Sequence, residues 1–282
     1  MTVAVAVPAS PASSPETFGG ADLERRFGGL RRLYGDAAYA RIRAAHVAVV
    51  GVGGVGSWAA EALARSGVAG LTLIDLDHVS ESNVNRQVQA LGSTLGQAKV
   101  EALRERIADI HPGCAVHAVD AFVEEGNWPA LLQAPVHVLI DACDDVRAKT
   151  TLAAWARDTG TALVVVGAAG GKRAAQRVEV ADLADVTHDP MLASMRQRLR
   201  KQHAGARSGP FGLICVFSRE RVAMPADEAC GIEGGAAADG SLNCHGYGSS
   251  VTVTATFGMV AAAAALESVA LPQPRPSRSA TL

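Results

Sequence analysis

Four closely spaced glycines in VAVVGVGGVGSWAAEALARSG (47–67) follow an apolar run and precede an alanine-rich segment. Glycine is needed where a turn is tight and where a phosphate must approach backbone N–H groups at a helix N-terminus. The spacing therefore predicts a phosphate-binding turn made by Gly51, Gly53, Gly54 and Gly56. Because this pattern is a weak signal by itself, an ordinary strand-to-helix turn is the alternative.

Two acids at the end of the next predicted strand suit the ribose of the same nucleotide. Asp75 lies about 20 residues beyond the glycines, where a carboxylate accepts hydrogen bonds from ribose hydroxyls. Asp77 could assist it there or lie near metal-bound phosphates. The alternative role of Asp75 is that of a solvated acid at a strand end.

Amide and cationic side chains that follow the acids favour a triphosphate over a dinucleotide. They are Asn83, Arg86, Gln87 and Lys99, the last of which opens a predicted helix. Arginine can grip two phosphate oxygens and lysine acts as a point charge, so both suit the β and γ groups of ATP. Each cation alone is more often a solvated surface residue, but the four residues together indicate ATP.

The segment IDACDDVRAK (140–149) ends a further predicted strand, at the edge where ligands bind in open α/β sheets. We expect Asp144 to hold Mg²⁺ and to orient the triphosphate. Asp145 is expected to cap the following helix, and Asp141 to be a structural acid at the strand end.

The elements that would position these residues alternate along the chain. We expect strands at 47–50, 71–75, 115–119, 136–141 and 162–166, and helices at 57–65, 98–110 and 148–158. Such alternation forms right-handed β-α-β units. The predicted fold is α/β, with a Rossmann-like, doubly wound, mostly parallel sheet and an elaborated C-terminal half.

Pattern and composition divide the chain into four segments. Residues 1–20 and 271–282 are expected to be disordered tails. Residues 21–170 form the predicted ATP-binding domain. Residues 171–270 form the expected substrate-binding and dimer-forming elaboration, with strands near 178–181 and 213–218.

Charge and cysteine usage exclude several classes of protein. A net charge of −2 over 282 residues gives no global attraction to nucleic acid or anionic lipid. Five cysteines without a C-x-x-C pair argue against a disulfide framework and a zinc site, and favour the cytoplasm. The uncharged stretch 248–266 approaches a membrane span in length, but its small residues favour a buried or dimer-packing helix.

The order of the motifs G-x-G-G-x-G, D-x-D, N-x-x-R-Q, a helix-opening lysine and D-x-x-D resembles the adenylation domain of the ubiquitin-activating superfamily. That superfamily includes bacterial enzymes that adenylate sulfur-carrier proteins. The resemblance implies that Asp75 binds ribose, that Asn83, Arg86 and Lys99 bind the triphosphate, and that Asp144 is the catalytic acid on the metal side. It also implies a homodimer, in which Arg32 of RFGGLRRLYG (26–35) reaches the partner's γ-phosphate.

Within the superfamily, residues 27–266 resemble the tRNA threonylcarbamoyladenosine dehydratase branch, through segments such as GAAGGK (167–172) and CVFSRE (215–220). The paired C-x-x-C motifs usual in the sulfur-carrier branch are absent from the sequence. The resemblance implies ATP-dependent cyclisation of threonylcarbamoyladenosine next to the anticodon, through an acyl-adenylate of the threonyl carboxylate. It leaves open a structural monovalent cation and a sulfur-relay partner protein.

A tRNA substrate requires a local basic surface, because the whole chain is not basic. The segment from 191 to 207 contains no acid. It contains five cations that we expect to contact tRNA: Arg196, Arg198, Arg200, Lys201 and Arg207. A solvated helix face is the alternative.

Three other functions stay open from the sequence. Adenylation of a small protein's C-terminus would use the same ATP site. An NAD-dependent oxidoreductase would use the glycines and Asp75 but give Arg86, Lys99 and Asp144 no task. A degenerate scaffold would bind nucleotide without chemistry. A catalytic thiol at Cys215, Cys230 or Cys244 is disfavoured, because intramolecular attack on an acyl-adenylate needs no covalent cysteine.

Overall fold

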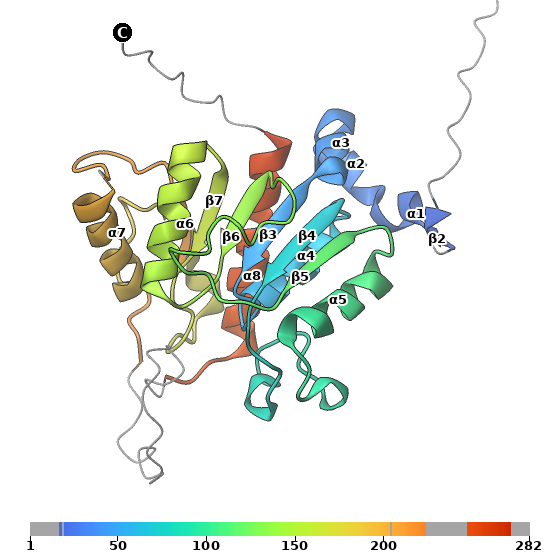
Figure 1. Ribbon diagram of the computed structural model, residues 1–282, viewed down its shortest axis with the longest axis horizontal. Coiled ribbons are helices and arrows are strands. Elements are labelled where there is room, and N and C mark those ends of the chain that lie inside the picture. Colours follow the sequence, from blue (N-terminus) through green and yellow to red (C-terminus); the bar gives the residue numbers. More distant parts are fainter. Residues whose placement is uncertain (1–16, 19, 204, 224–246, 272–282) are drawn as a thin grey trace, which may run out of the picture.

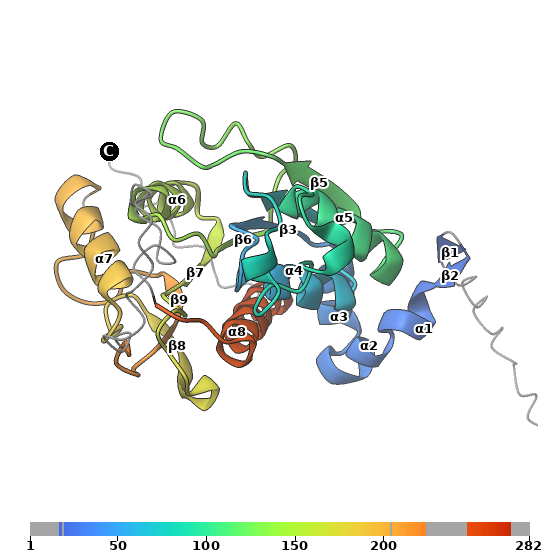
Figure 2. The same ribbon diagram turned by 90° about the horizontal axis from the view of Figure 1, so that it is seen from below.

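The computed structural model describes residues 17–18, 20–203, 205–223 and 247–271. Its main sheet has seven strands in the order β5-β4-β3-β6-β7-β9-β8 (Figures 1 and 2). Their bounds are β3 (His46–Val50), β4 (Gly70–Ile74), β5 (Ala115–Val119), β6 (Val138–Asp141), β7 (Ala162–Val166), β8 (Val178–Asp182) and β9 (Ile214–Ser218). Only the β8–β9 pair is antiparallel among these strands. The predicted Rossmann-like, mostly parallel α/β fold is confirmed.

Helices cover both faces of the sheet, because successive side chains of a strand point to opposite faces. Val47 and Val49 belong to the core beneath α4 (Gly56–Arg65), α5 (Lys99–Ile110) and α8 (Val251–Ala270). Ala48 and Val50 belong to the core beneath α6 (Val146–Thr159) and α7 (Pro190–Gln202). Figure 2 shows α6 and α8 on opposite sides of the central strands.

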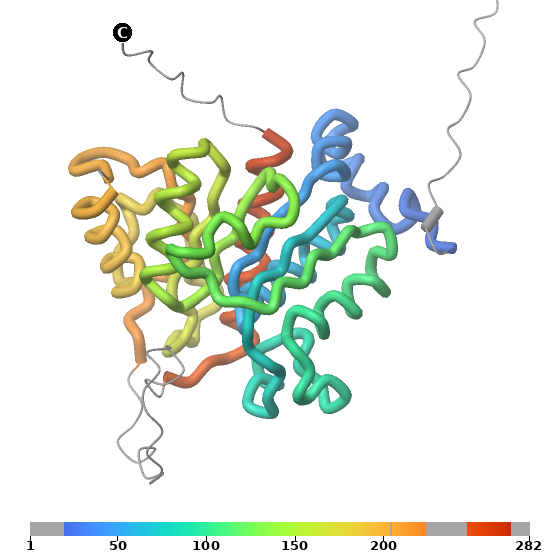
Figure 3. The backbone as a smooth tube through the Cα atoms, viewed as in Figure 1, coloured from blue at the N-terminus to red at the C-terminus, as the bar shows by residue number. Residues whose placement is uncertain are grey.

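The last helix packs against the first half of the chain. Figure 3 traces α8 back to a place beside α3 (Asp36–Ala44) and α4. Gly258 makes the approach to α4 possible, because a Cβ there would lie 2.5 Å from the carbonyl oxygen of Val55. One sheet and its two cores therefore span the predicted boundary at residue 170. The assignment of ATP binding to the first segment and of substrate binding to the second stays a prediction.

Helix α8 is long and apolar enough to cross a membrane by length and composition alone. However, 61% of its most apolar window is buried inside the protein. Packing against the sheet and α4 accounts for this apolar composition, as the interpretation of residues 248–266 expected. The helix also runs past Glu267 to Ala270, beyond the predicted end.

The N-terminal part of the described chain holds β1 (Thr17–Phe18), β2 (Ala21–Asp22), α1 (Leu23–Phe27) and α2 (Gly29–Tyr34). Short 3₁₀ turns occupy Glu81–Asn83, Gly92–Thr94 and Ala175–Arg177. The basic helix α7 (Pro190–Gln202) ends at Gln202, so Arg207 of the basic segment lies outside it. There the chain turns back, and the Gly205 N–H donates to the Leu199 carbonyl.

Candidate active site

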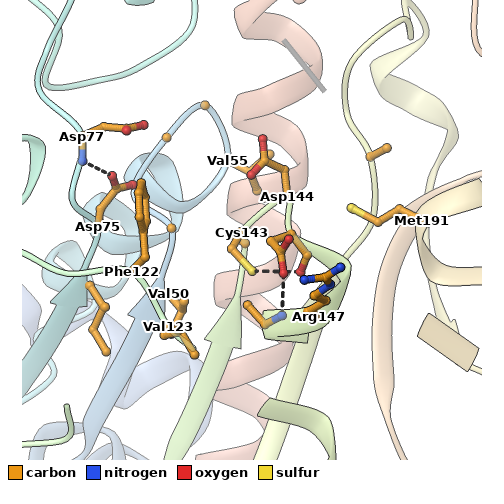
Figure 4. Close-up of a pocket in the computed structure, with 18 of the residues that line it drawn as sticks. Val50, Val55, Asp75, Asp77, Phe122, Val123, Cys143, Asp144, Arg147 and Met191 are labelled. Atoms are coloured by element: carbon orange, nitrogen blue, oxygen red, sulfur yellow. Dashed lines mark hydrogen bonds between the residues drawn. The ribbon is translucent and has the colours of Figure 1, made fainter. Parts of the chain in front are cut away.

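A pocket of about 1250 Å³ opens at the carboxyl ends of β3, β4, β6 and β7 (Figure 4). The sheet order reverses between β3 and β6, which is where ligands bind in doubly wound folds. Lining residues come from the glycine turn, the ends of β4 and β6, the 167–170 loop and α7. The predicted nucleotide turn and the predicted basic helix thus meet at one cavity.

The four glycines of the turn have two different roles. Gly51 has φ +80°, and a Cβ there would lie 2.8 Å from the backbone of Cys143. A Cβ at Gly56 would lie 1.8 Å from the Gly51 carbonyl oxygen, so this glycine allows the turn to enter α4. Gly53 and Gly54 line the pocket; a Cβ at Gly53 would leave that space open, whereas one at Gly54 would lie 3.3 Å from the Thr254 side chain.

Asp75 holds the glycine turn and the end of β4 together. Its carboxylate accepts hydrogen bonds from the N–H groups of Val52 (2.7 Å) and Asp77 (2.9 Å). Burial raises the pKa of Asp75, and the Lys99 ammonium opposes that rise most strongly. Asp75 lines the pocket, where its remaining lone pairs can accept bonds from ribose hydroxyls.

Lys99 reaches the pocket from the first position of α5, as predicted. Its Nζ lies 2.6 Å from the Asp77 carboxylate, and the lysine side chain is buried whereas Asp77 is exposed. Both residues line the pocket. A phosphate entering here would compete with Asp77 for the ammonium group.

Arg86 is a buried cation in the pocket wall. It donates to the Ser82 carbonyl (2.6 Å) and to the Asn85 amide oxygen (3.0 Å), and no described carboxylate pairs with it. Burial lowers the pKa of Arg86 because desolvation disfavours the charged form. An anion bound beside it would compensate this desolvation, which is the property expected of a phosphate site.

Asn83 and Gln87 play different parts. Gln87 lines the pocket, whereas Asn83 does not. The Asn83 side chain accepts from the Ser80 N–H, and its carbonyl accepts from the N–H groups of Arg86 and Gln87. Asn83 thus shapes the turn that carries Arg86, and its predicted contact with the triphosphate stays a prediction.

Asp144 is exposed in the pocket, in the loop between β6 and α6. The two neighbouring acids have the predicted structural roles. Asp145 caps α6 by accepting from the Ala148 N–H (2.7 Å). Asp141 is fully buried and pairs with the equally buried Lys149 at 3.1 Å.

Sequence reasoning missed Lys149, which donates to the Asp141 carboxylate and to the Val166 carbonyl (2.8 Å). This ammonium group joins the ends of β6 and β7, from which two pocket loops begin. The available signal was its place one turn before the buried Leu152 and Ala153 of α6, inside an apolar stripe. Phe122, which is 52% exposed and lines the pocket near Asp75, was also missed (Figure 4).

The five cations proposed to contact tRNA occupy three kinds of environment. Arg196 donates to the carbonyls of Leu183 (3.0 Å) and Val186 (2.9 Å), so it anchors the preceding loop. Arg200 donates to Ala206 and lies 5.3 Å above the Phe211 ring. Arg198 lines the pocket, and Lys201 and Arg207 are exposed.

Hydrogen bonds join segment 167–172 to segment 215–220 beside the pocket. Both segments contribute to the family resemblance described above. Lys172 is buried and donates to the carbonyls of Ser218 (3.1 Å) and Glu220 (2.9 Å). The Glu220 carboxylate accepts from the N–H groups of Arg173 and Ala174. Asp189, at the start of α7, accepts from Ala168 in the same loop (2.8 Å). These contacts hold α7 against the pocket.

The remaining predictions concern metal, cysteine and dimer contacts. The described residues contain no cluster of three or more His, Cys, Asp or Glu side chains that could hold a metal by themselves. Cys215 is completely buried in β9, and burial raises its pKa, which fits packing rather than nucleophilic attack. Cys230 and Cys244 lie outside the described residues. Arg32 is exposed on α2 and does not line this pocket.

The fold and the site define a Rossmann-like nucleotide-binding protein of the adenylating kind, with a glycine turn, a strand-end acid and a buried arginine in one pocket. The family model of the ThiF family matches residues 26–279, and the chain belongs to this family.

Relatives along most of the chain include two tRNA threonylcarbamoyladenosine dehydratases. The protein from Escherichia coli is 42% identical, over 86% of this chain and 92% of its own. The protein from Haemophilus influenzae is 38% identical, over 85% and 91%. The crystal structure of the E. coli enzyme in complex with ATP is similar with a TM-score of 0.77 at 41% identity, covering 87% of this chain and 94% of that one. The resemblance inferred from the motifs is confirmed.

Proposed function

We propose that this protein catalyses the ATP-dependent dehydration of threonylcarbamoyladenosine in tRNA, with release of AMP and pyrophosphate. One observation carries the proposal. A single pocket joins a glycine turn and a buried arginine, which suit ATP, to a wall formed by the basic helix α7. The similarity to dehydratases of this kind over most of both chains supports the same activity here.

ATP fits the part of the pocket between the glycine turn and β4. The N–H groups at the start of α4 and the Arg86 guanidinium suit the phosphates. Asp75 suits the ribose hydroxyls, and the exposed ring of Phe122 beside it offers an apolar surface to the base (Figure 4). The Lys99 ammonium suits the triphosphate once a phosphate oxygen replaces the Asp77 carboxylate as its partner.

The chemistry gives the substrate carboxylate a leaving group. A carboxylate oxygen attacks the α-phosphorus of ATP, and the bond from that phosphorus to pyrophosphate breaks. A nitrogen of the substrate's ureido group then attacks the activated carbonyl, AMP leaves, and the nitrogen loses its proton to water. Because both groups belong to one side chain, the effective molarity can reach about 10⁵ M. The protein has mainly to position the two substrates and to neutralise phosphate charge.

Mg²⁺ fits the donor set around Asp144. This ion is commonly held by one or two carboxylates together with substrate phosphates, rather than by an all-protein cage. Asp144 is exposed to the pocket and free of hydrogen bonds and ion pairs among the described residues, so it can serve as that carboxylate. The ion would supply charge neutralisation for the pyrophosphate leaving group.

We further propose a homodimer in which Arg32 serves the pocket of the second copy. Arg32 lies on α2, outside the pocket of its own chain. Lys201 and Arg207 are proposed to contact tRNA outside the pocket. A cytoplasmic location, a sulfur-relay partner and a structural monovalent cation also belong to the proposal.

The other functions considered from the sequence have less support. Transfer of hydride to NAD gives no task to Arg86 or Asp144, although both line the pocket. Adenylation of a sulfur-carrier protein would leave the pocket-facing part of α7 without a role.

The proposed function is tested by incubating the protein with ATP, Mg²⁺ and tRNA that carries threonylcarbamoyladenosine, followed by mass spectrometry of the nucleosides. The modified nucleoside should lose the mass of one water, and AMP should appear in equal amount. Omission of ATP and the Asp144→Asn variant are the controls. An unchanged nucleoside, in the presence of folded protein that binds ATP, would refute the proposal. ATP–pyrophosphate exchange that needs a small carrier protein instead of tRNA would favour the carrier function.

A further inference from the structure

Two arginines line the pocket on the side away from the predicted ATP site. Arg147 lies in the first turn of α6, and Arg198 lies in the second half of α7. Figure 4 shows Asp75 and Asp77 on one side of Asp144, and Arg147 and Met191 on the other. The part of the pocket lined by α6 and α7, the α6–α7 wall, therefore carries two cations in addition to Arg86 and Lys99.

Neither Arg147 nor Arg198 makes a side-chain hydrogen bond or ion pair with the described residues. The neighbouring arginines of the same helices behave differently. Arg196 is bound to loop carbonyls, Arg200 to Ala206, and Arg157 to the His203 carbonyl at 3.4 Å. Arg147 and Arg198 thus differ from structural arginines on these elements, and both keep their donors available to a ligand.

The helices that carry the two arginines are anchored at their N-termini. Asp145 caps α6 at the Ala148 N–H, and Asp189 caps α7 at the Leu192 N–H (3.0 Å). Leu152 of α6 and Leu199 of α7 belong to the same buried core. The backbone positions of the two arginines are therefore fixed on packed helices, and their planar guanidinium groups can each bind an anion in the pocket.

Acids in the pocket do not neutralise this wall. Asp144, Asp145, Glu124 and Glu125 also line the cavity, but no described carboxylate lies within ion-pair distance of either arginine. The ATP phosphates have their own partners at the glycine turn, Arg86 and Lys99. The two arginines of the α6–α7 wall, which have no ion pair among the described residues, are therefore available to a second anionic ligand.

We propose that Arg147 and Arg198 form a phosphodiester subsite, which holds the RNA backbone next to the reacting nucleotide. This inference rests on the proposed function, because tRNA is the second substrate there. Gln202 and His203, which line the same part of the pocket, offer polar and flat surfaces to the adjoining ribose and base. Binding the backbone at this wall would bring the modified side chain over Asp144 toward the α-phosphate.

The test uses Arg147→Gln, Arg198→Gln and the double variant, with Arg25→Gln as the matched control. Arg25 is exposed on α1, at the opposite end of the molecule from α7 (Figures 1 and 2). Binding is measured over a range of salt concentrations with tRNA that carries threonylcarbamoyladenosine and with the unmodified transcript. ATP affinity is measured by calorimetry, and thermal melting checks the fold.

Each single variant should bind both RNAs about tenfold more weakly, as expected when a charged hydrogen bond is removed. The slope of log K against log salt should become shallower by about 0.7–0.9 for each phosphate that the variant no longer neutralises. ATP affinity and the binding of the control variant should not change. Arg147→Lys and Arg198→Lys should keep most of the salt slope, because they keep the charge.

Three results would overturn the subsite. The first is a double variant that binds tRNA with the same affinity and the same salt slope as the wild-type protein. Another is a loss of ATP affinity, which would assign the arginines to the triphosphate. The third is weaker binding of modified tRNA alone, which would assign them to the threonyl carboxylate. The wild-type protein could also fail to dehydrate the substrate while the binding of both RNAs still depends on the two arginines. In that case the proposed function is refuted and the RNA subsite is supported.

Discussion

Replacing Lys149 by methionine tests how the active-site loop is held. Lys149 and Asp141 are both 0% exposed and lie 3.1 Å apart, and Lys149 also donates to the Val166 carbonyl. Burial opposes the charge on Lys149, but the surrounding acidic groups, Asp141 first among them, together hold the pKa of the lysine above its ordinary value. The variant leaves a buried carboxylate without its cation, together with an acceptor that has lost its donor.

Breaking a buried pair from one side costs about 3–5 kcal/mol, which is a large part of the 5–15 kcal/mol that stabilises a typical domain. Burial already raises the pKa of Asp141, with Lys149 as the strongest opposing influence. Removing Lys149 should therefore raise this pKa further. The destabilisation should be greatest at neutral pH and smaller at acidic pH, where the carboxyl group is protonated in the folded state at less cost.

Urea unfolding, followed by circular dichroism at pH 5.5 and pH 7.5, measures this effect. Lys201→Met is the matched control, because Lys201 is exposed and should contribute less than about 0.5 kcal/mol. The double variant Asp141→Asn with Lys149→Met should recover part of the loss, since it removes the buried charge. A cost of less than about 1 kcal/mol for Lys149→Met, or an equal cost at both pH values, would refute the reasoning.

Three further predictions concern the site and its support. Asp144→Asn should lower the dehydration rate about 100-fold or more without changing the melting temperature, and an active variant would exclude Asp144 from the reaction. Gly51→Ala should destabilise the protein by more than about 1 kcal/mol and abolish ATP binding, because φ is +80° and the new Cβ would lie 2.8 Å from Cys143. Gly53→Ala should keep the fold, since its nearest neighbour would be 3.8 Å away, and thermal melting distinguishes the two variants. Burial lowers the pKa of His111 to about 4, so the neutral ring stabilises the fold above about pH 6.5 and that stability is lost as the pH falls toward 4. Denaturation at pH 7 and pH 4.5 should show a loss that is smaller in His111→Gln, and equal losses would contradict this role.

The glycine turn shows how far local sequence reaches. Its position, the strand before it and the helix after it could be predicted, because the spacing of glycines and apolar residues is a local property. The different roles of Gly51 and Gly56 could not, since they depend on backbone atoms of Cys143 and of the turn itself. The same limit applies to Asn83, whose hydrogen bonds turn it into a support for the Arg86 segment.

The basic segment 191–207 shows a case in which the sequence pattern did not predict the roles of the individual residues. Its five cations form one group along the chain, and charge alone predicts a common task. The structure separates them, because the helix turns successive residues to different neighbours. Arg196 donates to loop carbonyls, Arg200 lies over the Phe211 ring, and Arg198 lines the pocket. Arg147, which is distant in sequence, joins Arg198 as part of the pocket lining.

The sequence by itself determined the α/β class, the strand and helix pattern, the nucleotide turn and the family resemblance, because these depend on residue type and spacing over short stretches. Only the tertiary structure decided which charges are free and which are neutralised. Asp141 and Lys149 neutralise each other, Arg86 stays buried without a described carboxylate, and Arg147 faces the same cavity as Arg198. The physical reason is that the energy of a charge depends on its burial and on partners that are brought together only when the sheet assembles.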